Sequence, residues 1–126
     1  MDYQATRSYM LSRPEAWEDF PFYPHIAVMK VRSKMFATLS VDAGIARMNL
    51  KCDPVEAQML RDIFSAVLPG YHMNKLHWNT ILLDGSIPNG ELERMIDRSY
   101  ALVVKGMGRK ERLPLELQYG CEVLYR

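Results

Sequence analysis

The sequence is poor in several features that would assign it to a class of protein. Its 126 residues include two cysteines and three histidines, and the formal net charge is only +1. No apolar run approaches the roughly 20 residues that a helix needs to cross a bilayer. The N-terminal MDYQATRSYML lacks the basic and apolar regions of a signal peptide. We therefore expect a cytoplasmic protein with no membrane partner, in which Cys52 and Cys121 are both reduced.

Motifs for phosphate, metal or covalent chemistry are also missing. The chain has no GxGxxG and no GxxxxGK loop. His72 and His77 are the only close pair of histidines, and their odd spacing would place them on opposite sides of an extended segment. A zinc site needs three or four convergent ligands, and Ser86 lacks the elbow motif of a serine nucleophile. We predict no metal, no cofactor and no catalytic residue, and we favour a binding protein over an enzyme.

What the chain does have is the composition of one globular domain. Apolar residues make up 48% and charged residues 25% of the sequence, which suits a single hydrophobic core built from residues 1–126. The densest mixture of aromatic and polar side chains lies in residues 69–85, PGYHMNKLHWNTILLDG, between a Pro-Gly turn and an Asp-Gly turn. We expect the rest of the chain to be organised around this stretch.

The order of the periodic segments predicts an α+β fold. Helical periodicity and capping signals predict helices at residues 2–12, from Asp53 to Pro69–Gly70, and from Pro88–Gly90 to Gly106 or Gly108. Short apolar runs predict strands at residues 26–32, 35–41, 46–51 and 77–83. We expect residues 15–25 to be irregular or extended chain, with aromatic side chains on the core edge, and residues 109–126 to be a mixed tail with an extended piece at 122–125. This order favours an antiparallel sheet with helices packed on one face.

The start of the second helix carries strong local signals. Asp53 suits the N-cap, Pro54 suits the first helical position, and Glu56 completes the pattern of a capping box. The core should then bury the apolar stripe of this helix, which consists of Val55, Met59, Leu60, Ile63, Phe64 and Val67.

Cross-strand pairing within the first three strands follows from the hydrophobic pattern. Turns centred on Ser33 and on Ala43–Gly44 make one face of this sheet wholly apolar, with Met48 and Leu50 turned toward the helices. The other face is then polar and basic, with Phe36 exposed between Lys30 and Lys51.

This polar face is the strongest candidate for a binding surface. The segment from His25 to Cys52 contains five basic residues and one acidic residue, although such charge can also serve solubility alone. Lysine and arginine seek phosphates, while amide and aromatic side chains contact bases. Neutralising about four phosphates would give a log–log salt slope near −3.5. The candidate nucleic-acid-binding residues are Lys30, Lys34, Arg47, Asn49, Lys51, Asn74, Lys75, His77, Trp78 and Asn79.

Other functions remain open at this point. The neighbourhood of Lys75, His77 and Asp84 could bind a small ligand or support general acid–base chemistry, and the protein could be a protein-interaction module. Trp78 is either a core residue or a surface on which bases stack. A deep pocket beside Lys75 and His77 would favour a ligand, whereas a basic face without a cleft would favour DNA.

Several segments resemble the MmcQ/YjbR family. They are NLKCDP at 49–54, PGYHMNKLHWNT at 69–80, LDGSIP at 83–88, SYALVVK at 99–105, and shorter matches at 19–22 and 34–37. The resemblance covers roughly residues 2–110, and residues 109–126 lie outside the strong match.

The resemblance implies a CyaY-like, or frataxin-like, two-layer α+β fold and a bacterial protein described as binding DNA through a double wing. DNA is then the expected partner, and we expect a monomer. The acidic helix with which frataxins hold iron has no counterpart, because the first helix contains only Asp2 as an acid. The family residues carried onto this chain are Lys34, Asn49, Lys51, His72, Asn74, Lys75, His77, Trp78, Asn79 and Thr80.

Overall fold

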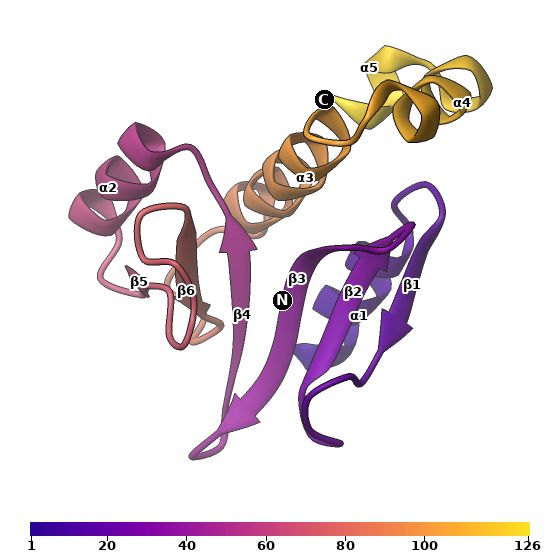
Figure 1. Cartoon of the computed structure of the whole chain (residues 1–126). Helices are drawn as coiled ribbons and strands as arrows, with labels where there is room; N and C mark the ends of the chain where they lie inside the picture. Colours follow the sequence, from indigo (N-terminus) through magenta and orange to yellow (C-terminus); the bar gives the residue numbers. More distant parts are fainter.

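A six-stranded antiparallel sheet forms one layer of the protein, as seen in a computed structural model that covers residues 1–126. The strand order is β1-β2-β3-β4-β6-β5 (Figure 1). The strands are β1 (Ala16–Asp19), β2 (Ala27–Val31), β3 (Lys34–Asp42), β4 (Ile45–Lys51), β5 (Val67–Pro69) and β6 (Trp78–Leu82). The predicted α+β fold is confirmed together with its four predicted strands. The edge strands β1 and β5 lie outside the prediction.

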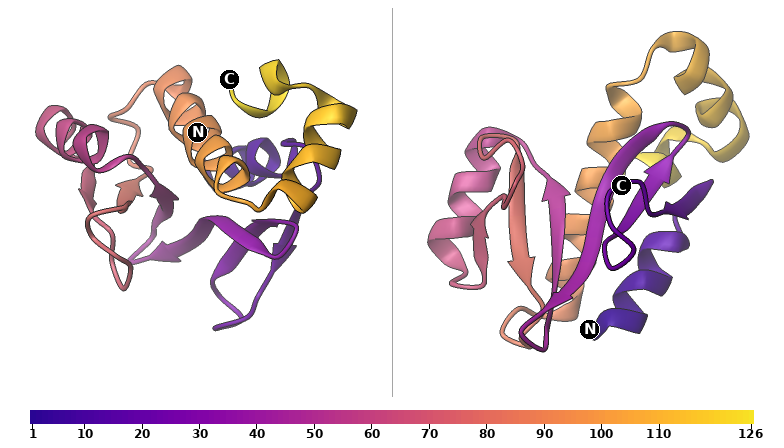
Figure 2. Two further views of the ribbon diagram at one scale, coloured as in Figure 1. Left: turned by 45° about the horizontal axis from the view of Figure 1, so that its top comes forward. Right: turned by 60° about the horizontal axis from the view of Figure 1, so that its bottom comes forward.

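Helices form the second layer. They are α1 (Tyr3–Leu11), α2 (Pro54–Ile63), α3 (Asn89–Lys105), α4 (Arg109–Tyr119) and α5 (Cys121–Leu124). The first three pack on one side of the sheet, and no helix covers the other side (Figure 2, left). We call this uncovered side the open face. None of the helices has the length and apolar character that crossing a membrane requires.

A bulge between β2 and β3 changes the predicted register at one end. Pairing is as predicted up to Met29, but Lys30 then pairs with Met35, so Phe36 is left without a partner. Phe36 is completely buried, and its ring meets Tyr100 edge-on with 5.3 Å between the ring centroids. The prediction that Phe36 is exposed on the open face is wrong, because a bulged residue no longer follows the strand alternation.

Near the bulge, β3 and β4 diverge from one another (Figure 1). Ser99 of α3 fills the opening between them. Its hydroxyl donates a hydrogen bond of 2.6 Å to the Phe36 carbonyl and accepts one of 2.8 Å from the Lys51 N–H. Ser99 is completely buried. The helix layer thus completes the hydrogen bonds of two strands and fixes the backbone of Lys51.

Helix α2 begins as predicted but ends sooner. Asp53 caps it by accepting hydrogen bonds from the N–H groups of Val55 and Glu56. After Ile63 the chain turns to form β5 at the edge of the sheet, so only one narrow side of α2 reaches the core. Val55, Met59 and Ile63 are 71%, 54% and 65% exposed. The predicted burial of this stripe is therefore wrong for these three residues, whereas Leu60 and Val67 are buried as predicted.

Residues 109–126 are helical, so the predicted extended piece at 122–125 is also wrong. Gly120, with a φ of 85°, separates α4 from α5. Leu115 and Leu124 are completely buried in the core. Arg13 donates a hydrogen bond of 2.7 Å to the Val123 carbonyl. The segment therefore packs on the start of the chain instead of forming a loose tail.

Candidate nucleic-acid interface

Alternate residues of β4 build the centre of the open face. Met48 and Leu50 are buried in the core, 0% and 2% exposed. Arg47, Asn49 and Lys51 therefore point away from the helices, because successive side chains of a strand lie on opposite faces. This part of the predicted register is confirmed.

Lys51 and Trp78 are direct cross-strand neighbours on the open face. The register between β4 and β6 pairs them and also pairs Asn49 with Thr80. The Thr80 hydroxyl bonds to the Asn49 amide oxygen, which places both on the open side. Trp78, two residues from Thr80, lies on the same side. The side chains of Lys51 and Trp78 are both half-buried.

A chain of hydrogen bonds crosses the open face from the β5–β6 loop to β3. The Tyr71 N–H donates to the Thr80 hydroxyl at 2.9 Å, and the Thr80 hydroxyl donates in turn to the Asn49 amide oxygen. The Asn49 amide nitrogen then donates to the Thr38 hydroxyl at 3.0 Å. These bonds occupy the Asn49 amide, so this residue positions the loop above it rather than offering a free amide to a ligand.

Two cations of the predicted basic face are neutralised by carboxylates. Lys30 donates to Asp19 at 2.8 Å, and its Nζ lies 5.2 Å from the centre of the Trp17 ring. Arg47 lies 3.2 Å from Asp42. A carboxylate at this distance cancels much of the attraction that the cation would exert on a phosphate.

The other predicted lysines keep their charge available. None of the ion pairs in the protein involves Lys34, Lys51 or Lys75. Lys34 is exposed at the start of β3, but it pairs with the core residue Val31, so the bulge places it on the helix side of the sheet and its predicted position on the basic face is wrong. Lys75 is exposed in the β5–β6 loop, which borders the open face. The unpaired positive charge at the open face therefore rests on Lys51 and Lys75.

The β5–β6 loop, residues 70–77, is pressed against the start of β6. The Gly70 N–H donates to the Trp78 carbonyl at 2.9 Å. A Cβ at Gly70 would approach that carbonyl oxygen to 2.8 Å, so a larger residue does not fit. Asn74 shapes the loop by accepting a bond of 2.9 Å from the Leu76 N–H. Asn74 therefore acts as a turn residue, and the loop presents Lys75 to solvent.

Asn79, a predicted contact residue, serves the fold through its side chain. Asn79 is 1% exposed, accepts a bond of 2.8 Å from Arg61, and donates one of 3.3 Å to the Ala57 carbonyl. The prediction that Asn79 contacts a ligand is therefore wrong, because the alternation of β6 turns it toward α2. His77 is half-buried, and its carbonyl accepts a bond of 2.8 Å from the Cys52 N–H.

Exposed aromatic rings beside the open face were missed by the sequence analysis. Residues 15–25 were expected to pack their rings on the core edge, but Phe20, Phe22 and Tyr23 in the β1–β2 loop are 50%, 63% and 59% exposed. The available signal was the prolines, Pro21 and Pro24, that interrupt these aromatics. A proline-rich segment of this kind cannot join the sheet and bury its rings there.

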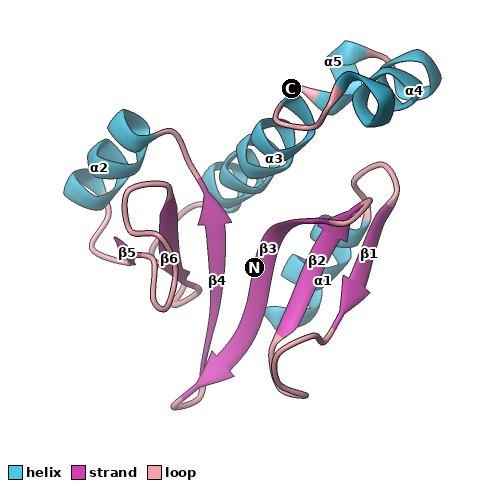
Figure 3. Cartoon of the chain, in the orientation of Figure 1, coloured by secondary structure: helices cyan, strands magenta, loops and turns pink.

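A second aromatic group lies across the sheet. Tyr71 of the β5–β6 loop is 62% exposed, and its ring centroid lies 4.1 Å from that of His72. Figure 3 draws both segments as loops, and Figure 2 (left) shows that they project on the side away from the helices, flanking β3 and β4. The two loops therefore border the open face.

Comparison with known proteins places this architecture in a family. Residues 11–102 match the family model YjbR. The chain belongs to the YjbR family. The resemblance expected from the sequence motifs is confirmed, and the match runs from the end of α1 through most of α3.

Relatives within the YjbR family are similar over most of their length. YjbR of Escherichia coli strain K12 is 31% identical over 104 residues, which cover 82% of this chain and 88% of YjbR. YyaQ of Bacillus subtilis strain 168 is 35% identical over 95 residues, covering 68% of this chain and 80% of YyaQ. The crystal structure of Deinococcus radiodurans protein DR2400 is similar with a TM-score of 0.84 and 36% identity, covering 90% of this chain and 87% of DR2400. These names state no activity, so function has to be argued from chemistry.

The alternative ligand site is not assembled in this YjbR-family protein. His77 and Asp84 flank β6 at opposite ends, roughly 20 Å apart along an extended chain. Asp84 instead accepts hydrogen bonds from the hydroxyl and the N–H of Ser86, at 2.6 and 3.0 Å, and these hold the pKa of its carboxyl below the usual value. Lys75 is exposed on its loop, so the three predicted groups do not converge.

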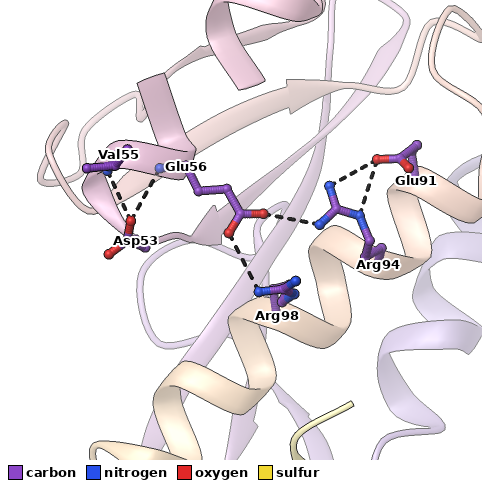
Figure 4. A network of polar contacts seen from close by, with 6 residues as sticks. All are labelled: Asp53, Val55, Glu56, Glu91, Arg94 and Arg98. Carbon is purple, nitrogen blue, oxygen red and sulfur yellow. Dashed lines mark hydrogen bonds and ion pairs between the residues drawn. The ribbon is translucent and has the colours of Figure 1, made fainter. Parts of the chain in front are cut away.

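A cleft of about 330 Å³ does exist, but it lies on the helix side, between α2, α3 and the C-terminal residues. No residue of the β5–β6 loop lines it. Glu56 in its wall pairs with Arg94 at 3.2 Å and with Arg98 at 3.8 Å (Figure 4). Cys52 also lines it, and burial raises the pKa of this thiol to about 11. Cys52 and Cys121 are unpaired, as predicted.

Proposed function

We propose that this YjbR-family protein binds nucleic acid, with DNA as the expected partner, through its open face. The observation that carries the proposal is the direct pairing of Lys51 with Trp78 on a sheet face that no helix covers. A lysine without an ion pair attracts a phosphate, and an indole beside it offers a surface to a base. Lys75 in the adjoining β5–β6 loop adds a second unpaired cation.

The structure also reduces the expected strength of binding. With Lys30 and Arg47 held by carboxylates and Lys34 on the helix side, about two phosphates can be neutralised instead of about four. The log–log slope of affinity against salt is then about −1.8 for duplex and about −1.4 for single strands. Binding should therefore be weak at physiological salt and clear at low salt.

The proposed form is a monomer in a bacterial cytoplasm, where an exposed free thiol such as Cys121 persists. A small-ligand function receives no support from the arrangement of Lys75, His77 and Asp84, and we do not propose it.

The test is a fluorescence anisotropy titration of labelled duplex and single-stranded oligonucleotides of about 20 nucleotides, at salt concentrations from about 20 to 200 mM. A variant that combines Lys51→Glu and Lys75→Glu should lose binding to all sequences alike, because phosphate contacts position rather than specify. The slope of the wild type should lie between about −1 and −2.

The matched control reverses two cations of the helix layer, with Arg109→Glu and Lys110→Glu. These residues are exposed, and neither of them forms an ion pair. They lie at the start of α4, away from the sheet (Figure 1). This variant has the same net charge as the first and should retain most of the binding. Equal losses in the two variants, or no binding by folded wild type at low salt, would overturn the proposal.

A further inference from the structure

The open face offers more exposed aromatic rings than unpaired lysines. A large ring buries about 150–250 Å² when it is covered, so these rings mark a surface suited to stacking. The exposed rings on the strands and loops at its borders are Trp17, Phe20, Phe22, Tyr23 and Tyr71, which are 44–63% exposed. The ligand that suits this surface is therefore one that presents flat, unpaired rings as well as negative charge.

A duplex does not suit this face. The major groove of a duplex, where each base pair can be distinguished, admits a helix or a two-stranded ribbon. The helices lie on the other layer (Figure 2, left). The ribbon formed by β3 and β4 carries Asp42 at its tip, next to Val41 and Ile45, which are 53% and 41% exposed. An acid and two apolar side chains would meet phosphates unfavourably, and the nearby Arg47 is already paired with Asp42 at 3.2 Å.

A single strand suits this surface better than a duplex, because its unpaired bases can leave the stack and lie on aromatic side chains. Each bordering loop holds a tyrosine against a histidine, Tyr23 with His25 at 5.5 Å and Tyr71 with His72 at 4.1 Å between ring centroids. A ring held by its neighbour loses less conformational freedom when a base stacks on it.

The spacing of the strands is also suitable. The loops follow β1 and precede β6, and between them run β2, β3 and β4. β2 and β6 are separated by three strand spacings, about 14 Å across the sheet. Because β2 and β6 run in opposite directions, the two loops join the sheet at opposite ends, so a strand that contacts both would cross the open face obliquely. Lys51 lies between the loops on β4, beside Trp78 of β6.

We infer that the open face binds single-stranded nucleic acid, with bases stacked on Tyr23 and Tyr71 and with the intervening phosphates near Lys51. This inference rests on the proposed function and specifies the kind of strand and the groups that touch the bases. Deoxyribose and ribose strands share this chemistry, so the test includes both.

The experiment compares the affinities for oligo(dT), oligo(U) and a duplex of equal length by anisotropy at one low salt concentration. Sedimentation velocity of the same samples measures whether the protein self-associates. Wild type should bind at least one of the single strands about tenfold or more tightly than the duplex. Tyr23→Leu and Tyr71→Leu should each weaken single-strand binding about tenfold, and duplex binding much less. Tyr23→Phe and Tyr71→Phe are the matched controls. They keep the ring, should bind as wild type does, and separate stacking from hydrogen bonding by the hydroxyl.

Different failures have different meanings. A duplex bound as tightly as the single strands would overturn the inference and leave the proposed function standing. Absence of binding to any strand would overturn both. If the leucine variants bind as wild type does, while the wild type self-associates and the leucine variants do not, the rings form a protein contact and the inference is wrong.

Discussion

Replacing Ser99 with alanine should lower the free energy of unfolding by about 2–5 kcal/mol. The completely buried hydroxyl accepts a bond of 2.8 Å from the Lys51 N–H and donates one of 2.6 Å to the Phe36 carbonyl. Alanine would leave this N–H and this carbonyl without partners, at a cost of about 1–3 kcal/mol each. The higher helix propensity of alanine offsets only about 0.5 kcal/mol of this loss.

Urea denaturation of the two proteins measures this difference. Ser8→Ala is the matched control, because Ser8 lies in α1 and is exposed. It should change stability by no more than about 0.5 kcal/mol. Hydrogen exchange of the Lys51 amide should also become faster in the Ser99→Ala protein. A loss no larger than that of the control would show that the α3 hydroxyl does not complete the hydrogen bonding between β3 and β4.

Three further predictions test the core and the thiols. Phe36→Ala should lower the free energy of unfolding in urea by about 3–5 kcal/mol because the ring is completely buried. A loss under about 1 kcal/mol would indicate that the ring is exposed, as the strand alternation predicts. The free energy of unfolding should fall as pH rises from about 9 to about 11, because an unfolded chain releases thiol and phenol protons at their ordinary pKa values. Burial raises the pKa of Cys52 to about 11 and that of Tyr100 to about 12 in the folded protein. A free energy of unfolding that stays constant in urea denaturation at a series of pH values would contradict these shifts. Iodoacetamide should alkylate exposed Cys121 before buried Cys52, as mass spectrometry of the peptides would show, and equal rates would refute the burial of Cys52.

The centre of the sheet could be predicted because its signals are local. The alternation of residues 46–51 determines which side chains of β4 face the core, and Met48 and Leu50 are buried accordingly. Asp53 and Pro54 mark the start of α2 for equally local reasons. In both places the residues that carry the signal also make the contacts.

The remaining features depend on partners that are distant in sequence. Met35, Phe36 and Ala37 are three apolar residues in a row, so the alternation cannot show which of them is bulged. Packing on Tyr100 of α3 decides that it is Phe36. Similarly, the charge of Lys30 is neutralised by Asp19 only because β1 joins the sheet beside β2.

The candidate site likewise combines features that the local sequence predicts with features that depend on distant partners. The position of Lys51 beside Trp78 follows from strand alternation and pairing, although the pairing of β4 with β6 is visible only in the structure. Asn79 was misassigned because its bonds to Arg61 and Ala57 come from α2. The exposure of the loop rings, such as Tyr71, depends on which parts of the sheet the helices leave uncovered.

The most direct test of the central claim is a map of amide and indole chemical shifts while the full chain is titrated with a single-stranded oligonucleotide at low salt. The proposal predicts that shifts concentrate on the open face and its two loops, at Lys51, Tyr71, Lys75 and the indole N–H of Trp78, while α3 and α4 remain unchanged. Shifts confined to the cleft beside Arg98 and Lys105, or no shifts at saturating oligonucleotide, would contradict it.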